Sequence, residues 1–418
     1  MNVLIKSATI LDKNSDFHNK TQDILVENGF ITKISNKLQN PNKYPVLALE
    51  NLHVSNGWFD SSVSFGEPGF EERETISNGL EVAASSGFTD ISLNSNTFPV
   101  IDSHSDISFI ISKSKDTLTK LHPIGALTSE SKGIDLADIF DMKLAGSIAF
   151  GDYKKPIKNP NLLKIALQYA SNFDGVVHSF PLEEKVAKNG VMNENINSTS
   201  LGLKGIPSLA EELQIVRDLF ILEYSGGKLH IPTISTKKSV DLIRSAKLKK
   251  LNVSCSVAIH NLLYTDEKLK DFDTNFKVNP PLRLASDNKA LIEGVMDGTI
   301  DMVTSDHDPI NIEYKKIEFD FAKNGTIGLE SAFGALNSLF STKKTIQLLT
   351  NGKERFGISN SIINIGNKAQ LSLFNPSKSY VFEKKHILSK SKNSLFIGSK
   401  LKGYVYGVIA NNSSSIKI

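Results

Sequence analysis

Residues 207–231 read PSLAEELQIVRDLFILEYSGGKLHI, a helix pattern followed directly by a strand pattern. The apolar residues of the first part recur at intervals of three and four, at Leu209, Leu213, Val216 and Phe220. This spacing places them on one face of an amphipathic helix. Pro207 suits the first position of such a helix, and Gly226 suits its end. The short run KLHIP then predicts a buried strand.

The same alternation extends from about residue 54 to about residue 362. A second helix is predicted in NPNLLKIALQYA, where Asn159 is a suitable N-cap and Pro160 follows it. The short apolar runs between the amphipathic stretches are NGWF, TDISL, PIGAL, GSIAF, GVVHS, KLHIP, VSCSV and IDMVT. Eight predicted strands alternate with helices, and eight is the number of strands that closes a parallel (β/α)₈ barrel. An open, doubly wound sheet is the alternative, although no glycine-rich phosphate loop follows the first run.

Both ends of the chain have a β pattern. Near the N-terminus VLIKSATIL alternates, and Asn28-Gly29 in VENGFI is a strong signal for a two-residue hairpin turn. Near the C-terminus the runs AQLSLF, SYVFE, NSLFIG and YVYGVIA are separated by polar residues and glycine. We therefore expect β structure before about residue 53 and after about residue 363.

Composition restricts the class of protein. The 418 residues are 40% hydrophobic and 22% charged, which allows a large core and excludes global disorder. With 48 basic and 45 acidic residues the net charge is +3, so nothing indicates nucleic acid or an anionic membrane as a partner. The single cysteine, Cys255, excludes a disulfide scaffold and a cysteine-based zinc site. The first apolar run is interrupted at Lys6 and Asp12, and we expect a cytoplasmic protein.

Acids and histidines follow several of the predicted strands. In a barrel of parallel strands, the residues at the carboxyl ends of the strands meet at one mouth. Asp60 follows the first run, and the candidates to converge at the mouth are Asp152, His178, His260 and Asp306. Histidine and carboxylate side chains are suitable zinc ligands. The alternative for each acid is a structural one, because Asp directly after a strand often caps the next helix.

Longer motifs carry a family resemblance. The segments are FDSSVSFGEPGFEERET, SNTFPVIDS, GVMNENINSTSLGLKGIPSLAEEL, KVNPPLR, EGVMDGTIDMVTSDHDP and GTIGLESAFGAL. In their order and spacing they resemble the dihydroorotases of the amidohydrolase superfamily. The resemblance implies a barrel over 54–362 and a small β-sandwich from 1–53 and 363–418. It also implies the closing and opening of the dihydroorotate ring in pyrimidine biosynthesis, with one or two zinc ions. KVNPPLR and GLKGIPSLAEE favour this branch over hydantoinases and allantoinases.

The chain departs from the family at the positions that resemble its metal ligands. The family's first strand ends in Asp-x-His-x-His, and here Ser62 and Ser64 stand at both histidine positions. Gly66 stands where the family has an arginine that binds the substrate carboxylate. Thr233 replaces a further histidine ligand in HIPT, and Ile310 replaces a histidine on the substrate side. Neutral hydroxyl groups are poor zinc donors, so we expect little or no bound zinc.

Other family positions are retained. The resemblance implies that Asp152, His178 and Asp306 occupy metal-ligand positions, and that Asp306 is also at the general-base position. Asn96 and Asn279 resemble substrate-contacting asparagines. Without a metal between them, we expect Asp152 and Asp306 to lie close together, with their charge met by water, by His178, or by a nearby lysine such as Lys154 or Lys155. His178 should then gain a proton more readily than a free histidine.

Two classes of function remain at this point. The first is a non-catalytic dihydroorotase homologue that acts as a structural or regulatory partner. Some family members that lack metal ligands associate with aspartate carbamoyltransferase, so the resemblance implies this enzyme as the partner. The resemblance also implies a homodimer. The second is an active dihydroorotase, or a related cyclic-amide hydrolase, with a rearranged site at Asp152, His178 and Asp306. His260 would be an additional donor there. We expect activity to be absent or very weak, because a metal supplies the activated water in this chemistry.

Overall fold

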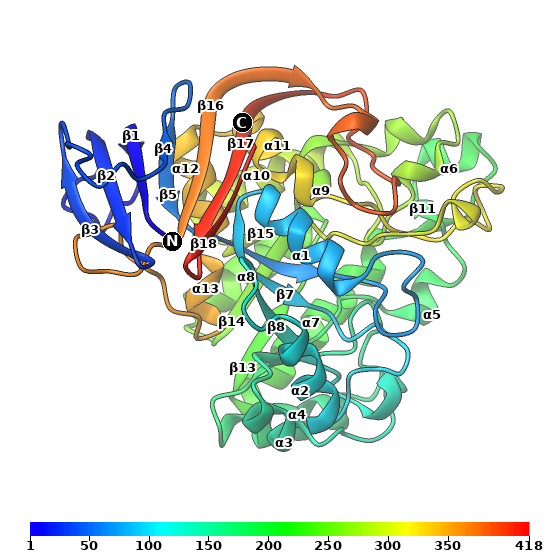
Figure 1. Ribbon diagram of the computed structural model, residues 1–418. Coiled ribbons are helices and arrows are strands. Elements are labelled where there is room, and N and C mark those ends of the chain that lie inside the picture. Colours follow the sequence, from blue (N-terminus) through cyan, green and yellow to red (C-terminus); the bar gives the residue numbers. More distant parts are fainter. Residues whose placement is uncertain (418) are drawn as a thin grey trace.

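The computed structural model describes residues 1–417 and contains a barrel and a sheet built from both chain ends (Figure 1). The barrel strands follow one another in chain order, each parallel to the next. They are β6 (Trp58–Val63), β7 (Phe88–Leu93), β8 (Lys120–Gly125), β9 (Ala149–Phe150), β10 (Val176–His178), β13 (Lys228–Ile231), β14 (Val253–Ala258) and β15 (Met302–Thr304). Each predicted run overlaps one of them. The barrel prediction is confirmed, and the open sheet is not the fold.

The barrel closes where β15 meets β6. The amide of Ser64 donates to the carbonyl oxygen of His307 at 2.7 Å. The carboxylate of Asp60 accepts from the amide of Ser305 at 2.9 Å and from the hydroxyl of Thr304. Asp60 therefore joins the first strand to the last, and its buried carboxylate is used for closure.

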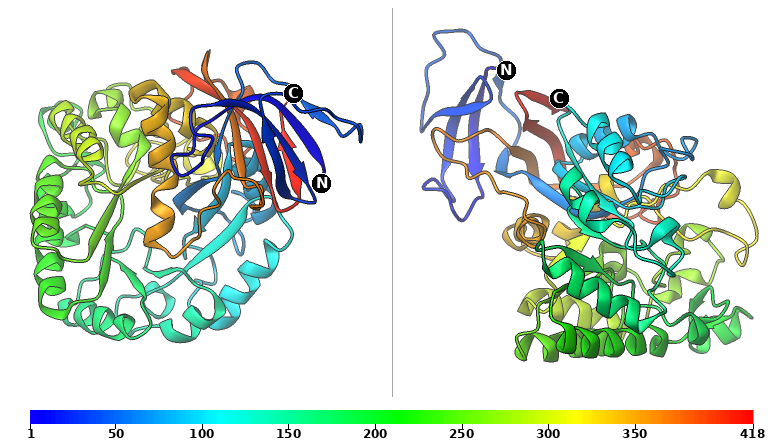
Figure 2. Two further views of the ribbon diagram at one scale, coloured as in Figure 1. Left: turned by 90° about the vertical axis from the view of Figure 1, so that its left-hand side faces the viewer. Right: turned by 90° about the horizontal axis from the view of Figure 1, so that it is seen from below.

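Helices surround the barrel (Figure 2). The longer ones are α1 (Ile76–Ser85), α2 (His104–Lys113), α3 (Ile139–Ala145), α4 (Pro160–Ser171), α7 (Ser208–Ser225), α8 (Lys237–Leu248), α10 (Ala285–Asp297), α11 (Leu329–Leu339) and α12 (Thr342–Thr350). The short elements are α5 (Glu184–Ala187), β11 (Met192–Asn193), α6 (Ile196–Ser200), β12 (Gly205–Ile206), α9 (Ile259–Leu263) and α13 (Gly352–Arg355). In α4 the side chain of Asn159 accepts from the amides of Asn161 and Leu162, as its predicted N-cap role requires. Within residues 1–417, no helix is long and apolar enough to cross a membrane.

Helix α7 confirms the predicted helix, but the predicted apolar face does not lie in the core. It starts at Ser208 with Pro207 as the N-cap residue and ends before Gly226. Leu209, Leu213 and Phe220 are exposed. The side chains that pack on the barrel are Ala210, Glu211, Gln214, Ile215, Asp218, Leu219 and Leu222. Polar side chains can lie on this inward face because the barrel supplies their hydrogen-bond partners.

The second sheet has the strand order β18-β17-β16-β5-β1-β2-β3, with β4 beside β1. Its strands are β1 (Val3–Ile10), β2 (Thr21–Glu27), β3 (Phe30–Ser35), β4 (Val46–Leu47), β5 (His53–Asn56), β16 (Leu371–Val381), β17 (Lys400–Ala410) and β18 (Ser413–Ile416). Asn28 and Gly29 join β2 to β3 with φ of 52° and 79°, which confirms the predicted turn. The predicted strand NSLFIG is not a strand. The division at 53/54 and 362/363 stays a prediction, with β5 spanning the first boundary.

Candidate functional site at the barrel mouth

A narrow hollow lies at the carboxyl ends of the barrel strands. The residues around it include Ser62, Asn94, Lys154, His178, Thr233 and Asp306. Its free volume is about 20 Å³, which is room for a single water molecule. Of the residues predicted to converge at the mouth, His178 and Asp306 line this hollow.

Lys154 neutralises the acids at this mouth. Its Nζ donates to Oδ2 of Asp306 at 2.9 Å and lies 3.9 Å from Oδ2 of Asp308. The hydroxyl of Tyr153 donates to the same Asp308 carboxylate at 3.3 Å. Burial alone would lower the pKa of Lys154, but the two carboxylates outweigh it and raise that pKa above its usual value. A nearby lysine was among the groups expected to neutralise Asp306, and Lys154 is that lysine.

Asp306 is almost completely buried. Desolvation raises its pKa to about 6, although Lys154 acts in the opposite direction. At neutral pH the pair is therefore a carboxylate and an ammonium. The hydroxyl of Ser62 donates to the second carboxylate oxygen at 3.4 Å. The protein's own ammonium group thus occupies the place of a cation beside Asp306.

The carboxylate of Asp152 is hydrogen-bonded to the chain that follows β8. Its Oδ1 accepts from the amides of Leu127 and Thr128 at 2.9 and 3.0 Å, and its Oδ2 accepts from the Thr128 hydroxyl. These bonds hold the loop that follows β8. Asp308, rather than Asp152, shares Lys154 with Asp306. The second acid of this pair could have been found in the motif SDHDP, where Asp308 follows Asp306 by two residues.

His178 is a neutral, buried histidine. Desolvation and the charge of Arg355 lower its pKa to about 3. The ring lies 4.8 Å from that of His230 and 5.8 Å from that of Phe356, between centroids. The expectation that His178 gains a proton readily is therefore wrong, because it faces rings instead of carboxylates.

Neutral hydrogen bonds connect the positions that replace family ligands. The amide nitrogen of Asn94 donates to the hydroxyls of Ser62 and Ser64 at 3.1 and 3.2 Å. The backbone amide of Thr233 donates to the Ser256 hydroxyl at 3.1 Å. The hydroxyls of Ser62 and Ser64 thus have partners, and neither they nor the hydroxyl of Thr233 carry a charge for a metal to neutralise.

The donor set does not fit zinc. Among residues 1–417, no three histidine, cysteine, aspartate or glutamate side chains are placed to hold a metal ion together. Asp306 is paired with Lys154, and Asp152 is bonded to the loop at Thr128. His260 is fully buried and does not line the hollow. The ligand roles of Asp152, His178 and Asp306 stay predictions from resemblance.

The position that resembles the family's arginine has no room for a side chain. Gly66 lies in a tight loop, where its amide donates to the carbonyl of Glu74 and its carbonyl accepts from the amide of Phe70. A Cβ atom on Gly66 would lie 1.8 Å from the carbonyl oxygen of Phe70. Asn96 and Asn279 do not line the hollow, and each has a buried side-chain oxygen without a partner in the described chain.

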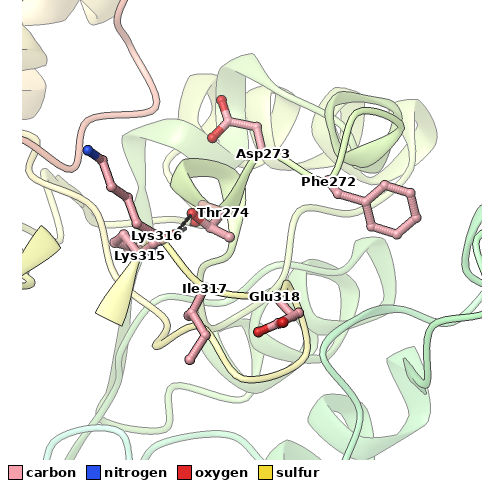
Figure 3. Close-up of a pocket in the computed structure, with 7 residues that line it drawn as sticks. All are labelled: Phe272, Asp273, Thr274, Lys315, Lys316, Ile317 and Glu318. Carbon is pink, nitrogen blue, oxygen red and sulfur yellow. Dashed lines mark hydrogen bonds between the residues drawn. The ribbon is translucent and has the colours of Figure 1, made fainter. Parts of the chain in front are cut away.

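A larger hollow of about 600 Å³ lies on the loops 272–274 and 315–318 (Figure 3). Thr274 donates its hydroxyl to the carbonyl of Lys315 at 2.6 Å. The side chains of Phe272, Asp273 and Glu318 point in different directions. This surface brings no set of polar groups to one point, and the barrel mouth remains the candidate site.

Comparison with known proteins gives the family. A family model described as Dihydro-orotase-like matches residues 53–239. The dihydroorotase of Acetivibrio thermocellus is 38% identical over 423 residues, covering 99% of both chains. The chain belongs to the dihydroorotase family. A second dihydroorotase, from Geotalea daltonii, is 36% identical and covers 96% of both chains.

Solved structures support the same fold for this dihydroorotase-family chain. The L-hydantoinase of Arthrobacter aurescens superposes with a TM-score of 0.85 at 19% identity, covering 100% of this chain and 97% of the other. The dihydropyrimidinase of Brevibacillus agri gives 0.84 at 18% identity, covering 100% and 95%. At such identities these similarities show the architecture alone.

Proposed function

We propose that this dihydroorotase-family protein acts in pyrimidine biosynthesis as a non-catalytic, cytoplasmic structural or regulatory partner. The observation that carries the proposal is the buried ion pair between Lys154 and Asp306 at the barrel mouth. It neutralises the acid that an active site of this family would use with a metal. Bulk water has a pKa of about 15.7, so without a metal it supplies no hydroxide at neutral pH.

The substrate side of the mouth supports the same proposal. A free volume of about 20 Å³ holds a water but not a six-membered ring. The tight loop at Gly66 leaves no position for a cation that would bind the substrate carboxylate. Turnover would require both the mouth and this loop to rearrange.

The scaffold, in contrast, is well ordered by buried polar contacts. Arg283 of KVNPPLR donates to the side chain of Asn193 and the carbonyl of Ile206, both at 2.9 Å. It also lies 3.7 Å from Glu211 of GLKGIPSLAEE. These two family segments thus hold the architecture together. A chain that keeps its architecture and lacks its ligand types is consistent with a role performed by its surface.

The deciding assay follows dihydroorotate ring opening by purified protein, with and without added zinc. The dihydroorotase of Acetivibrio thermocellus is the matched positive control. We expect no turnover in either condition, and elemental analysis should find no tightly held zinc. A kcat within the ordinary enzyme range of ~1–10³ s⁻¹ would overturn the proposal.

The partner proposed from the family resemblance is aspartate carbamoyltransferase. Co-purification of the two proteins from the source cell, at constant stoichiometry, would support this partner. The other candidate function is an active hydrolase with one metal at Asp152, His178 and Asp306. The names of the relatives at 36–38% identity favour it. Zinc-dependent turnover that is lost in His178→Ala would establish it.

A further inference from the structure

A second hollow lies at the opposite end of the barrel from the mouth, and we call it the basal hollow. The amino ends of three barrel strands line it, at Lys228 of β13, Val253 of β14 and Met302 of β15. Its other walls are the chain at 11–18, between β1 and β2, and the helices α12 and α13, which lie beside the terminal sheet (Figure 1). Its free volume is about 1020 Å³, at the upper end of the range for sites that hold small molecules.

Unpaired positive charge gathers on the basal hollow. Lys13, Lys343 and Lys344 line it, and none of the three forms an ion pair within residues 1–417. Arg355 also lines it, and its guanidinium donates to the carbonyl of Leu229 at 2.8 Å and to the side chain and carbonyl of Asn252. These acceptors are neutral, so four cationic side chains face this space without a carboxylate partner in the described chain.

Most of the acids on the same hollow already have partners. Asp301 pairs with Lys247 at 2.7 Å, and Asp12 accepts from two backbone amides at 3.0 and 2.9 Å. Glu354 is the third acid of the lining, and its carboxylate is exposed. The unpaired charge of the hollow is therefore positive, which favours an anionic ligand.

Three buried nitrogen atoms of the lining residues have no hydrogen-bond partner within residues 1–417. They are Nε of Arg355 and both ring nitrogens of His18. Buried polar atoms in folded proteins are nearly always bonded, so these atoms independently indicate a polar ligand. Burial also lowers the pKa of Lys344 and of Arg355, and a bound anion would favour their charged forms.

Neutral side-chain amides lie beside the cations. Within the described chain, five of them line the hollow without a hydrogen bond to another residue: Asn14, Asn56, Gln347, Asn351 and Asn360. An amide both donates and accepts, which suits the hydroxyl groups of a sugar. Lysine and arginine side chains, in turn, form strong charge-assisted bonds with phosphate.

We propose that the basal hollow binds a sugar phosphate, either free or as part of a nucleotide. The phosphate lies at Lys343, Lys344 and Arg355, and the sugar hydroxyls bond to the side-chain amides. Lys343 and Lys344 are in the first turn of α12, where the helix dipole also favours an anion. The barrel mouth at Asp306 lies at the other ends of the strands, so the proposal does not depend on the absence of turnover there.

The first test is calorimetric titration of the purified protein with ribose 5-phosphate. Wild-type protein should bind it with a Kd below about 1 mM. Ribose, the matched neutral control, should not bind in this range. Inorganic phosphate should bind at least about 10-fold more weakly, because it cannot contact the amides. Adenosine 5′-monophosphate distinguishes the two sources: tighter binding than that of ribose 5-phosphate indicates a nucleotide, and weaker binding indicates a free sugar phosphate.

The second test reverses charge at the hollow. Lys343→Glu and Lys344→Glu should each weaken the binding of ribose 5-phosphate by roughly 10- to 100-fold, because each removes a charge-assisted contact. Lys185→Glu is the matched control, since Lys185 is an exposed lysine of α5 outside the hollow and the net charge changes equally. It should leave the Kd unchanged. Circular dichroism checks that each variant is folded.

Three results would overturn the proposal. The first is no binding of ribose 5-phosphate by wild-type protein up to about 10 mM. The second is equal affinity for ribose 5-phosphate and inorganic phosphate, which would leave the amides without a role. The third is an equal loss of binding in Lys185→Glu and Lys344→Glu, which would show that overall charge, and not the basal hollow, attracts the ligand.

Discussion

Lys154 supplies the positive charge that the buried carboxylates at the barrel mouth require. Its Nζ contacts Asp306 and lies near Asp308, and all three side chains are largely hidden from water. Burying an unpaired charge is costly, so each member of the cluster depends on the others. This arrangement gives the mouth a structural role even without substrate.

Replacing Lys154 by methionine keeps the length of the side chain and removes its charge. We expect Lys154→Met to lower the free energy of unfolding at pH 7 by about 3–5 kcal/mol, because Asp306 is left buried without a counter-charge. Urea denaturation measures this. In the double variant Lys154→Met/Asp306→Asn, much of the loss should be recovered.

A matched control uses a lysine in an exposed pair. Lys132 lies 2.9 Å from Glu130, and both side chains are more than half exposed. Lys132→Met should leave the urea midpoint unchanged, because solvent screens such pairs. Equal losses in the two lysine variants would show that the Lys154 pair has no special role.

His178 predicts a pH dependence of stability. Burial lowers its pKa to about 3, while the unfolded chain takes up the proton near pH 6.5. Its contribution to stability is therefore complete above pH 6.5 and is lost as the pH falls towards 3, at about 1.4 kcal/mol per pH unit.

Two measurements check this prediction. The ring resonances of His178 should not titrate between about pH 5 and 8 in NMR spectra of the folded protein. The variant His178→Phe should show a flatter loss of stability in acid. Titration of His178 near pH 6.5 would contradict the neutral, ring-packed state.

At the scale of elements, α7 shows how one polar side chain can anchor a helix to a loop. Glu211 accepts from the amides of Ser235 and Thr236 at 2.7 and 3.1 Å, and from the hydroxyl of Ser239 at 2.6 Å. These residues lead into α8, and Arg283 lies on the far side of the carboxylate at 3.7 Å. The carboxylate therefore fixes the position of α7 relative to α8.

Glu211→Gln should destabilise the protein by about 2–4 kcal/mol, measured by urea denaturation. The amide keeps the shape but removes the charge that balances the buried Arg283. The neighbouring variant Glu212→Gln is the control and should change stability by less than about 0.5 kcal/mol, because Glu212 is only half-buried. A comparable effect at both positions would argue against the anchoring role of Glu211.

At the scale of the whole molecule, the terminal sheet and the barrel share a core at Trp58. The indole is fully buried, and it stacks on Phe333 of α11 at 4.9 Å and contacts Phe374 of β16 at 5.6 Å, between centroids. Its Nε1 donates to the hydroxyl of Ser55 in β5 at 2.8 Å. Gly57 is the single residue between β5 and β6. The two parts are therefore joined by packing as well as by the chain.

This junction predicts cooperative unfolding. Trp58 is the only tryptophan, so fluorescence reports on the junction, while far-ultraviolet circular dichroism reports on all helices and strands. The two denaturation curves should coincide. Two separated transitions would show that the sheet and the barrel unfold independently.

The elements of this fold could be predicted from local sequence. The barrel runs, the hairpin at Asn28-Gly29 and the cap at Asn159 each depend on residues a few positions apart, and the structure confirms them. The absence of histidine at residues 62, 64 and 233 is also a property of the sequence itself. Such features need no knowledge of distant contacts, because propensity and periodicity act locally.

Only the tertiary structure decided which groups meet. Lys154 and Asp306 are 152 positions apart, and barrel closure brings them together. The inverted orientation of α7 follows from buried partners such as Ser235 and Arg283, which lie outside the helix. The tight loop at Gly66 likewise depends on a backbone path that no single motif specifies. Electrostatics and packing act between neighbours in space, so these properties emerge only when the chain has folded.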